Sequence, residues 1–221
     1  MKDKKVIAFS LWGDKPMYTI GAIRNAEISP EIYPGWICRF YIGQSTPKEV
    51  VEKLSSFEHV EVVMMPVEGN SIGMFWRFLA ASDPEVSVVI SRDTDSRLNE
   101  REKLAVDQWL ASDKIFHIMR DHPAHGVPIL GGMWGVKNPI LRRMSKMIES
   151  FAKEDRYQID QDFLRLEIFP LVQDKCMVHD VFFEHKPWPK ERDGYQFVGE
   201  PFDEDENPNE LFRSQIKDSG K

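Results

Sequence analysis

Short apolar runs alternate with amphipathic stretches along the first half of the chain. Runs of the kind found in strands that are buried on both faces occupy residues 6–11, 36–42, 60–65 and 86–90. Between these runs, apolar residues recur at helical spacing, which predicts helices over 18–28, 48–57 and 72–82. Strands that alternate with helices favour an α/β fold with a mostly parallel, Rossmann-like sheet and helices on both faces.

The second half of the chain is less regular. Its pattern predicts helices over 100–111, 139–151 and 160–172, the last of which is disturbed by Pro170. Strands are predicted over 115–119 and 177–183, and a glycine-rich apolar segment covers 127–136.

These elements predict the organisation of the chain. We expect one domain over residues 1–200, with a nucleotide-binding half (1–97) and a second half of mixed strands (98–200). Residues 201–221 are acidic, and we expect them to form a loose tail.

Charge and composition narrow the possible functions. The net charge is −7, whereas proteins that coat nucleic acid are usually basic, so we expect no nucleic-acid partner. The two cysteines, Cys38 and Cys176, are far apart and predict neither a disulfide framework nor a metal-binding pair. No stretch approaches the roughly 20 apolar residues of a membrane span. We therefore expect a cytoplasmic protein with no membrane span.

The most specific motif is Ser-Arg-Asp-Thr-Asp-Ser-Arg over residues 91–97, directly after the apolar strand 86–90. In open α/β sheets, ligands bind beyond the carboxyl ends of the strands. Two carboxylates that lie two residues apart in a turn, here Asp93 and Asp95, can converge on one hard cation. Mg²⁺ or Mn²⁺ would then link them to a diphosphate. The motif therefore predicts a metal site.

Two other interpretations of this motif compete with the metal site. Aspartates are common in turns, where one of them would cap the next helix. Phosphatases of the haloacid dehalogenase class also carry two aspartates after an apolar strand, and Asp93 would then be a nucleophile. In that class the motif usually follows the first strand, whereas here a whole βαβα block precedes it and Ser91 and Arg92 intervene. We therefore favour the metal site.

Two segments near the C-terminus carry further candidate groups. Asp160 and Gln161 precede an apolar stretch, where they either face a ligand or cap a helix. His179 lies in a predicted strand, where it either supplies a nitrogen ligand to the metal or is a partly buried histidine, and His185 competes for the ligand role. Lys186, on a proline-braced loop, either neutralises a leaving diphosphate or is simply solvated.

The middle of the chain adds a possible substrate surface. Gly131 and Gly132 either let the backbone approach a ligand closely or form a tight turn. Residues 120–125, Arg-Asp-His-Pro-Ala-His, gather polar groups after a predicted strand, and we interpret them as a substrate loop. Arg77 lies in an apolar helix, where a cation needs a partner in the aspartate motif or in a ligand.

Together these motifs resemble the glycosyltransferases with a GT-A fold. The order matches over residues 75–188: an arginine, the Asp-Thr-Asp motif, a glycine-rich strand, an Asp-Gln-Asp helix start, and a histidine followed by Lys-Pro-Trp. The chain is most similar to the retaining enzymes of glycosyltransferase family 8, which include glycogenin and bacterial lipopolysaccharide galactosyltransferases. The amino-acid sequence of segments 92–97 and 120–123 also resembles that of the small glycosyltransferase domains of large algal viruses.

This resemblance implies a single GT-A-like domain whose second half, residues 98–200, binds the sugar and the acceptor. It implies transfer of a hexose or deoxyhexose from a nucleotide-sugar to a glycan or glycoprotein acceptor. The expected donor is a UDP-sugar. It implies Mn²⁺ or Mg²⁺ as the cofactor, and Asp93, Asp95 and His179 as its ligands. The donor-binding residues would be Phe9, Ser10, Leu11, Trp12, Arg77, Arg92, Gly131, Gly132 and Lys186, with the base held by residues 9–12.

The resemblance also bears on catalysis, and it implies retention of configuration. Asp160 and Gln161 would face the donor sugar near its anomeric carbon. An inverting reaction would need a carboxylate base, for which the candidates are Asp121, Asp160 and Asp162.

Two departures from the family pattern leave questions open. The spacing from histidine to Lys-Pro-Trp differs, so His179 and His185 both stay candidates for the metal. Gly131-Gly132-Met133 replaces the expected Asn-Ala-Gly, which leaves the sugar and the stereochemistry open. A non-catalytic module that binds nucleotide-sugars is a further alternative.

Overall fold

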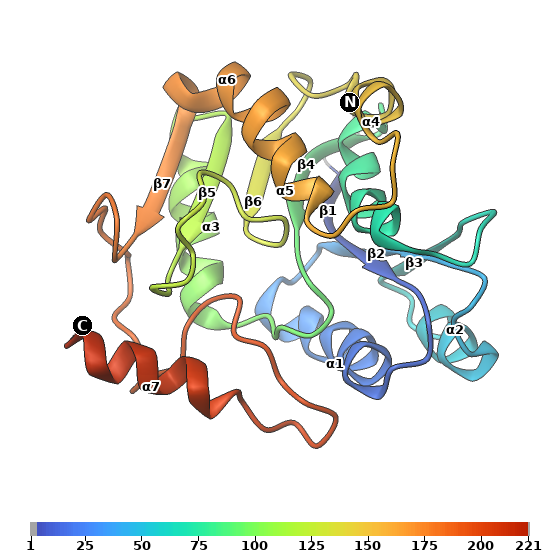
Figure 1. Cartoon of the computed structure of the whole chain (residues 1–221), viewed down its shortest axis with the longest axis horizontal. Coiled ribbons are helices and arrows are strands. Elements are labelled where there is room, and N and C mark those ends of the chain that lie inside the picture. Colours follow the sequence, from blue (N-terminus) through green and yellow to red (C-terminus); the bar gives the residue numbers. More distant parts are fainter. Residues whose placement is uncertain (1–3, 221) are drawn as a thin grey trace.

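The strands between residues 4 and 220, the part of the chain that the computed structural model describes, form one sheet (Figure 1). Its order is β3-β2-β1-β4-β6-β5-β7, with β1, β2, β3 and β4 parallel. β6 is antiparallel to both of its neighbours, and β7 is parallel to β5. The strands are β1 (Lys4–Leu11), β2 (Ile37–Ile42), β3 (Val60–Met64), β4 (Val86–Ser91), β5 (Phe116–Arg120), β6 (Trp134–Lys137) and β7 (Cys176–Asp180).

Helices cover both faces of this sheet (Figure 1). Val6 and Ala8 of β1 pack into one apolar cluster, whereas Ile7 and Phe9 pack into the other, because successive side chains of a strand point to opposite faces. The helical segments are α1 (Pro16–Ile32), α2 (Lys48–Ser55), η1 (Ser71–Ser82), α3 (Glu100–Ala111), α4 (Met144–Phe151), α5 (Ile159–Phe163), η2 (Leu164–Ile168), α6 (Phe169–Val172), η3 (Gln173–Lys175) and α7 (Glu210–Ser219). The predicted α/β fold, with its mixed second half, is confirmed.

Several boundaries differ from the sequence prediction for local physical reasons. The segment η1 is a 3₁₀ helix. It begins directly after Asn70, whose side chain caps it by accepting a hydrogen bond from the Ile72 N–H. The predicted helix 160–172 is divided into α5, the π-helical turn η2 and α6, and Pro170 lies in the first turn of α6. The strand β7 ends at Asp180, whose carboxylate accepts hydrogen bonds from the N–H groups of Phe182, Phe183 and Glu184 and so stabilises a turn.

The C-terminal region is ordered, which corrects the expectation of a loose tail. Pro201 forms an antiparallel bridge with Ser96, directly after the aspartate motif. The helix α7 begins after Asn209, whose side chain caps it, and Ile216 of that helix is fully buried. Acidic composition alone predicted solvation, but these apolar and backbone contacts hold the segment on the domain. None of the helices within residues 4–220 is long and apolar enough to cross a bilayer.

Candidate functional site

A pocket of about 700 Å³ lies where β1 and β4 end. These strands are parallel neighbours, so the loops that follow Leu11 and Ser91 meet at the same edge of the sheet. The volume is in the range of about 300–1,000 Å³ that is usual for small-molecule sites. Leu11, Trp12, Lys15, Arg77, Asp93 and Asp95 are among the residues that line it.

Asp93 and Asp95 form the acidic part of this pocket. The Asp93 side chain is 45% exposed and makes an ion pair with Arg77. Burial, followed by repulsion from Asp93, raises the pKa of Asp95 to about 6. A divalent cation bound between the two carboxylates would offset this electrostatic repulsion.

Arg77 reaches the same pocket from the helix η1. Its backbone N–H donates to the Ser10 Oγ at 2.9 Å, and its guanidinium is buried between Asp93 and Asp160. Burial alone would lower the pKa of Arg77, but these two carboxylates raise it above its ordinary value. Asp160 accepts from Nη2 of Arg77 at 3.2 Å and is 1% exposed, so its carboxylate lies behind the arginine. Burial raises the pKa of Asp160, although Arg77 opposes this.

The glycine-rich segment packs directly against these charged groups. A Cβ on Gly132 would lie 1.9 Å from Oδ2 of Asp93, and one on Gly131 would lie 2.3 Å from Nη2 of Arg77. The Ser91 hydroxyl donates to the Gly131 carbonyl at 2.7 Å. The Gln161 side-chain amide is oriented so that both of its polar atoms form hydrogen bonds. Its NH₂ group donates to the Ile129 carbonyl, and its oxygen accepts from the Gly131 N–H. Gly131, Gly132 and Gln161 therefore shape the site around Asp93 and Arg77.

The end of β1 supplies an aromatic surface. Trp12 packs edge-on against Trp76, with ring centroids 5.8 Å apart, and lies so close to Gly69 and Gly73 that a Cβ on either would collide with its ring. Ser10, Leu11 and Trp12, for which the resemblance implies donor binding, line the pocket. Phe9 does not line the pocket, because it is fully buried in the core and stacks on Phe40.

Two further candidates belong to the framework and not to the pocket. Arg92 is 2% exposed and donates to Glu102 at 3.1 Å, so its guanidinium points into the core and not toward a ligand. Asp121 is fully buried and accepts hydrogen bonds from the guanidinium groups of Arg101 and Arg192. With the backbone N–H of Val198, which also donates to Oδ2, each carboxylate oxygen accepts two hydrogen bonds, which leaves no lone pair directed at a substrate.

The third metal ligand expected from the sequence is elsewhere in the fold. His179 is 1% exposed, and its ring nitrogens contact His117 at 2.8 Å and Gln108 at 2.9 Å. Burial lowers the pKa of His179 to about 4. His185 and Lys186 follow β7, and neither lines the pocket. The reason is topological, because β6 and β5 separate β7 from β4 in the sheet.

Other residues of the pocket were partly or wholly missed by the sequence analysis. His122 and His125 line it, in agreement with the substrate loop expected over 120–125. Tyr18 lines it as well, and burial followed by Asp95 raises the pKa of its hydroxyl. Phe197 and Phe212 also line it, but they lie within or next to the segment expected to be a tail, and no local pattern marks them.

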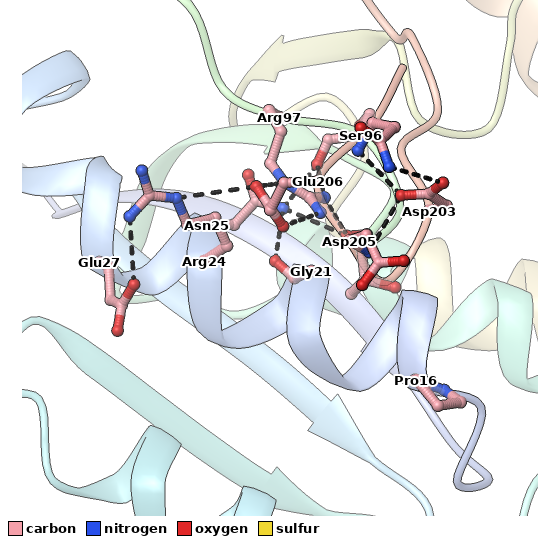
Figure 2. Close-up of polar contacts among 12 residues, drawn as sticks. Pro16, Gly21, Arg24, Asn25, Glu27, Ser96, Arg97, Asp203, Asp205 and Glu206 are labelled. Carbon is pink, nitrogen blue, oxygen red and sulfur yellow. Dashed lines mark hydrogen bonds and ion pairs between the residues drawn. The ribbon is translucent and has the colours of Figure 1, made fainter. Parts of the chain in front are cut away.

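The C-terminal segment is attached to the aspartate motif by polar contacts (Figure 2). Arg97 makes an ion pair with Glu206 at 2.7 Å and also donates to the carbonyls of Thr94 and Ser96. Asn25 of α1 donates to the Ser96 carbonyl at 2.7 Å. Hydrogen bonds and an ion pair therefore connect helix α1, the aspartate motif and the segment after Gly199.

The donor set of the site limits which cation it would hold. Within residues 4–220, no group of three or more His, Cys, Asp or Glu side chains is arranged to bind a metal. Asp93 and Asp95 therefore offer two carboxylates and leave the other positions to water or a ligand. This set fits Mg²⁺ or Mn²⁺, which keep waters and take phosphate oxygens, better than it fits a closed structural zinc site.

No protein-family model matches this chain, and no curated protein sequence matches it. Its fold is similar to solved structures. A glycosyltransferase involved in the glycosylation of the major capsid of PBCV-1 superposes with a TM-score of 0.53 at 16% identity, over 80% of this chain and 82% of that one. The galactosyltransferase LgtC, solved with donor and acceptor sugar analogues, gives 0.53 at 13%, over 80% and 73%. TarS 1–349 of S. aureus gives 0.55 at 13% identity, over 80% of this chain and 58% of that one. At these identities the likeness shows a shared fold.

Proposed function

We propose that this chain, which has the GT-A fold of those glycosyltransferases, transfers a sugar from a nucleotide-sugar to an acceptor with the help of a divalent cation. One observation carries the proposal: Asp93, Asp95 and Arg77 face the same pocket at the carboxyl ends of β1 and β4. Carboxylates that would hold Mn²⁺ or Mg²⁺ beside a guanidinium match the needs of a sugar diphosphate.

The reaction is a displacement at the anomeric carbon of the donor sugar. The bond from this carbon to the diphosphate oxygen breaks, a bond to the acceptor oxygen forms, and the proton of the acceptor hydroxyl passes to the leaving diphosphate. Asp93 and Asp95 would hold the cation, which, when bound, stabilises the charge that grows on the leaving diphosphate. Arg77, already held by Asp160, would orient a phosphate oxygen.

The nucleoside would bind on the side of the pocket formed by the end of β1. Leu11 and Trp12 line that side, and the Trp12 ring is held in place by Trp76 and the neighbouring glycines. An immobilised aromatic ring suits a planar base because little conformational freedom is lost on binding. We propose UDP-sugars as the first donors to test. Lys15, which lines the pocket, takes the phosphate-neutralising role that the sequence analysis assigned to Lys186.

Retention of configuration is part of the proposal. The three carboxylates considered as bases for inversion are each engaged by arginine: Asp121 by Arg101 and Arg192, Asp160 by Arg77, and Asp162 by Arg156 and Arg165. Asp14 lines the pocket and is the carboxylate that an inverting enzyme would use. Proton NMR of the product anomer tests this, because an inverted product would exclude retention. Loss of that inverted product in Asp14→Asn would then identify Asp14 as the base.

The deciding experiment is a thermal-shift and transfer screen of nucleotide-sugars with and without Mn²⁺. We expect one donor to raise Tm only when the metal is present, and Asp95→Ala to lower transfer by about 100-fold or more. Asp107→Ala is the matched control, since Asp107 lies on α3 and pairs with Lys103. Wild-type transfer by Asp95→Ala, or equal losses in both variants, would contradict the metal assignment.

The same screen separates the alternatives. A haloacid-dehalogenase-type phosphatase would release phosphate from small phosphoesters through an adduct on Asp93, and the glycosyltransferase structures that share this fold do not favour it. A non-catalytic module would bind the donor but neither hydrolyse it nor transfer its sugar.

A further inference from the structure

One wall of the pocket is aromatic and differs in chemistry from the rest. It is formed by His122, His125, Leu130, Phe197 and Phe212, which we call the aromatic wall. Among the described residues that line the pocket, the carboxylates and the Arg and Lys cations come from other segments: the loop after β1, the helix η1 and the aspartate motif. The pocket therefore has a charged side and an aromatic side.

The aromatic wall is packed as a unit. The His122 ring lies 4.5 Å from the Phe197 ring and 5.2 Å from the Phe212 ring, measured between centroids. Its Nε2 also contacts the Phe212 carbonyl oxygen at 2.9 Å, which joins helix α7 to the loop after β5. Rings that are held by each other present a pre-formed surface, so little entropy is lost when a ligand packs on them.

Backbone contacts determine which protons the two histidines carry. The Ala124 N–H donates to Nδ1 of His122 at 3.0 Å, and the Asp121 N–H donates to Nδ1 of His125 at 3.1 Å. A nitrogen that accepts a hydrogen bond carries no proton, so each neutral ring has its proton on Nε2. His122 donates this proton to Phe212. His125 keeps an N–H for a ligand, and burial lowers its pKa to about 3, so that it stays neutral.

None of the five residues of the aromatic wall carries a charge, because both of its histidines are neutral. The nearby guanidinium groups of Arg101 and Arg192 are turned toward the carboxylate of Asp121, and Arg213 makes an ion pair with Glu200. A charged ligand would therefore lose water without gaining a counter-charge from the wall itself, which is costly in a partly buried site. An uncharged ligand with apolar C–H faces and hydroxyl groups would meet both the rings and the N–H.

We propose that the aromatic wall is the acceptor subsite and that its ligand is an uncharged saccharide. This inference rests on the proposed function, in which the donor takes the side of Trp12, Asp93 and Asp95 and leaves the aromatic wall to the second substrate. The apolar face of a sugar ring packs on Phe212, and a sugar hydroxyl accepts from Nε2 of His125. The C-terminal segment thus supplies the acceptor side of the pocket, and this side determines specificity.

The test uses the full chain with neutral and charged probes. Methyl glucoside, galactoside and mannoside are compared with methyl glucuronide and sulfated methyl galactoside, first by saturation-transfer NMR and then as acceptors. In Phe212→Ala, we expect the KM of the best neutral acceptor to rise about tenfold, while the donor Kd measured with Mn²⁺ stays within about twofold. Leu211→Ala is the matched control, because its side chain is 67% exposed on the same helix and does not line the pocket.

The His125 contact is tested by a pair of substitutions. His125→Gln keeps an N–H donor and should retain most acceptor affinity, whereas His125→Leu should lose about tenfold. Equal losses in both variants would exclude the hydrogen bond.

Direct binding separates this inference from the proposed function. If no donor is used but a neutral glycoside binds the wild type and not Phe212→Ala, the saccharide site holds and the transferase proposal fails. If a donor is transferred but the charged probes bind better than the neutral ones, or Phe212→Ala behaves like Leu211→Ala, the acceptor subsite is overturned. Failure of every neutral glycoside to bind the wild type, alone or with the donor, overturns it as well.

Discussion

The backbone N–H of Phe202 donates to the carbonyl oxygen of Asp95 at 2.8 Å. This bond joins the C-terminal segment to the loop that carries the two carboxylates, next to the bridge between Ser96 and Pro201. A loop held on both sides loses less freedom when it binds a cation and a diphosphate. The segment that composition marks as a tail therefore stabilises the position of the candidate site.

The ion pair between Arg97 and Glu206 provides the first prediction (Figure 2). Arg97→Ala should lower the free energy of unfolding by about 2 kcal/mol, because it removes a buried guanidinium and leaves Asn25 as the remaining side-chain donor to the carbonyls of Thr94 and Ser96. Glu206→Gln should cost less than about 1 kcal/mol, since Glu206 is 40% exposed and water replaces its contact. Urea unfolding measures both values, and equal losses would contradict the buried role of Arg97.

A second prediction concerns the close approach of Gly132 to Asp93. In Gly132→Ala, the new methyl group would collide with the Asp93 carboxylate and displace it, so Mn²⁺ affinity should fall about tenfold or more. Gly126→Ala is the control, because its Cβ would meet only Phe183 at an ordinary 3.5 Å. Titration calorimetry with Mn²⁺ compares the two variants. Unchanged affinity in Gly132→Ala would show that the Asp93 carboxylate is not needed in this position.

Asp95 leads to a third prediction, on stability without divalent cations. Its pKa is about 6 in the fold and about 3.9 in an unfolded chain, so the folded state binds the proton more tightly. Ionised Asp95 therefore destabilises the fold above pH 6, and this penalty disappears as the pH falls toward 4. Asp95→Asn should be more stable than the wild type at pH 7.5 by up to about 3 kcal/mol, with a smaller difference at pH 4.5. A difference that does not change with pH would refute this sign.

The fourth prediction concerns His179, where the pH dependence of stability has the opposite sign to that at Asp95. Burial lowers its pKa to about 4, whereas an unfolded histidine has about 6.5, so the unfolded chain binds more protons between these values. The stability of the neutral, buried ring is fully present above pH 6.5 and is lost as the pH falls through 4. His179→Gln should flatten the unfolding free energy over this window. Urea unfolding of the wild type and of this variant across this window measures the difference, and an unchanged slope in His179→Gln would contradict the role of the neutral, buried ring.

Much of the fold was predictable from local pattern. The apolar runs at β1 and β4 are buried on both faces, and the turn after β4 carries Asp93 and Asp95 to the edge of the sheet. Ser10, Leu11, Trp12 and Arg77 line the pocket as well, but the family resemblance and not the local pattern implied a role for them in donor binding.

The same reasoning misplaced residues whose surroundings depend on distant partners. Arg92 follows the same strand as Asp93, but Glu102 draws its side chain into the core. His179 comes late in the chain like a family metal ligand, yet strand order places it beside His117.

The sequence by itself determined the alternation of strands and helices and the acidic turn after β4, since both depend on neighbours along the chain. Only the tertiary structure decided that His122, His125, Phe197 and Phe212 share a wall and that the acidic C-terminal segment completes the pocket. Those contacts join residues far apart in sequence, and they form because burial and hydrogen bonding outweigh what local composition favours.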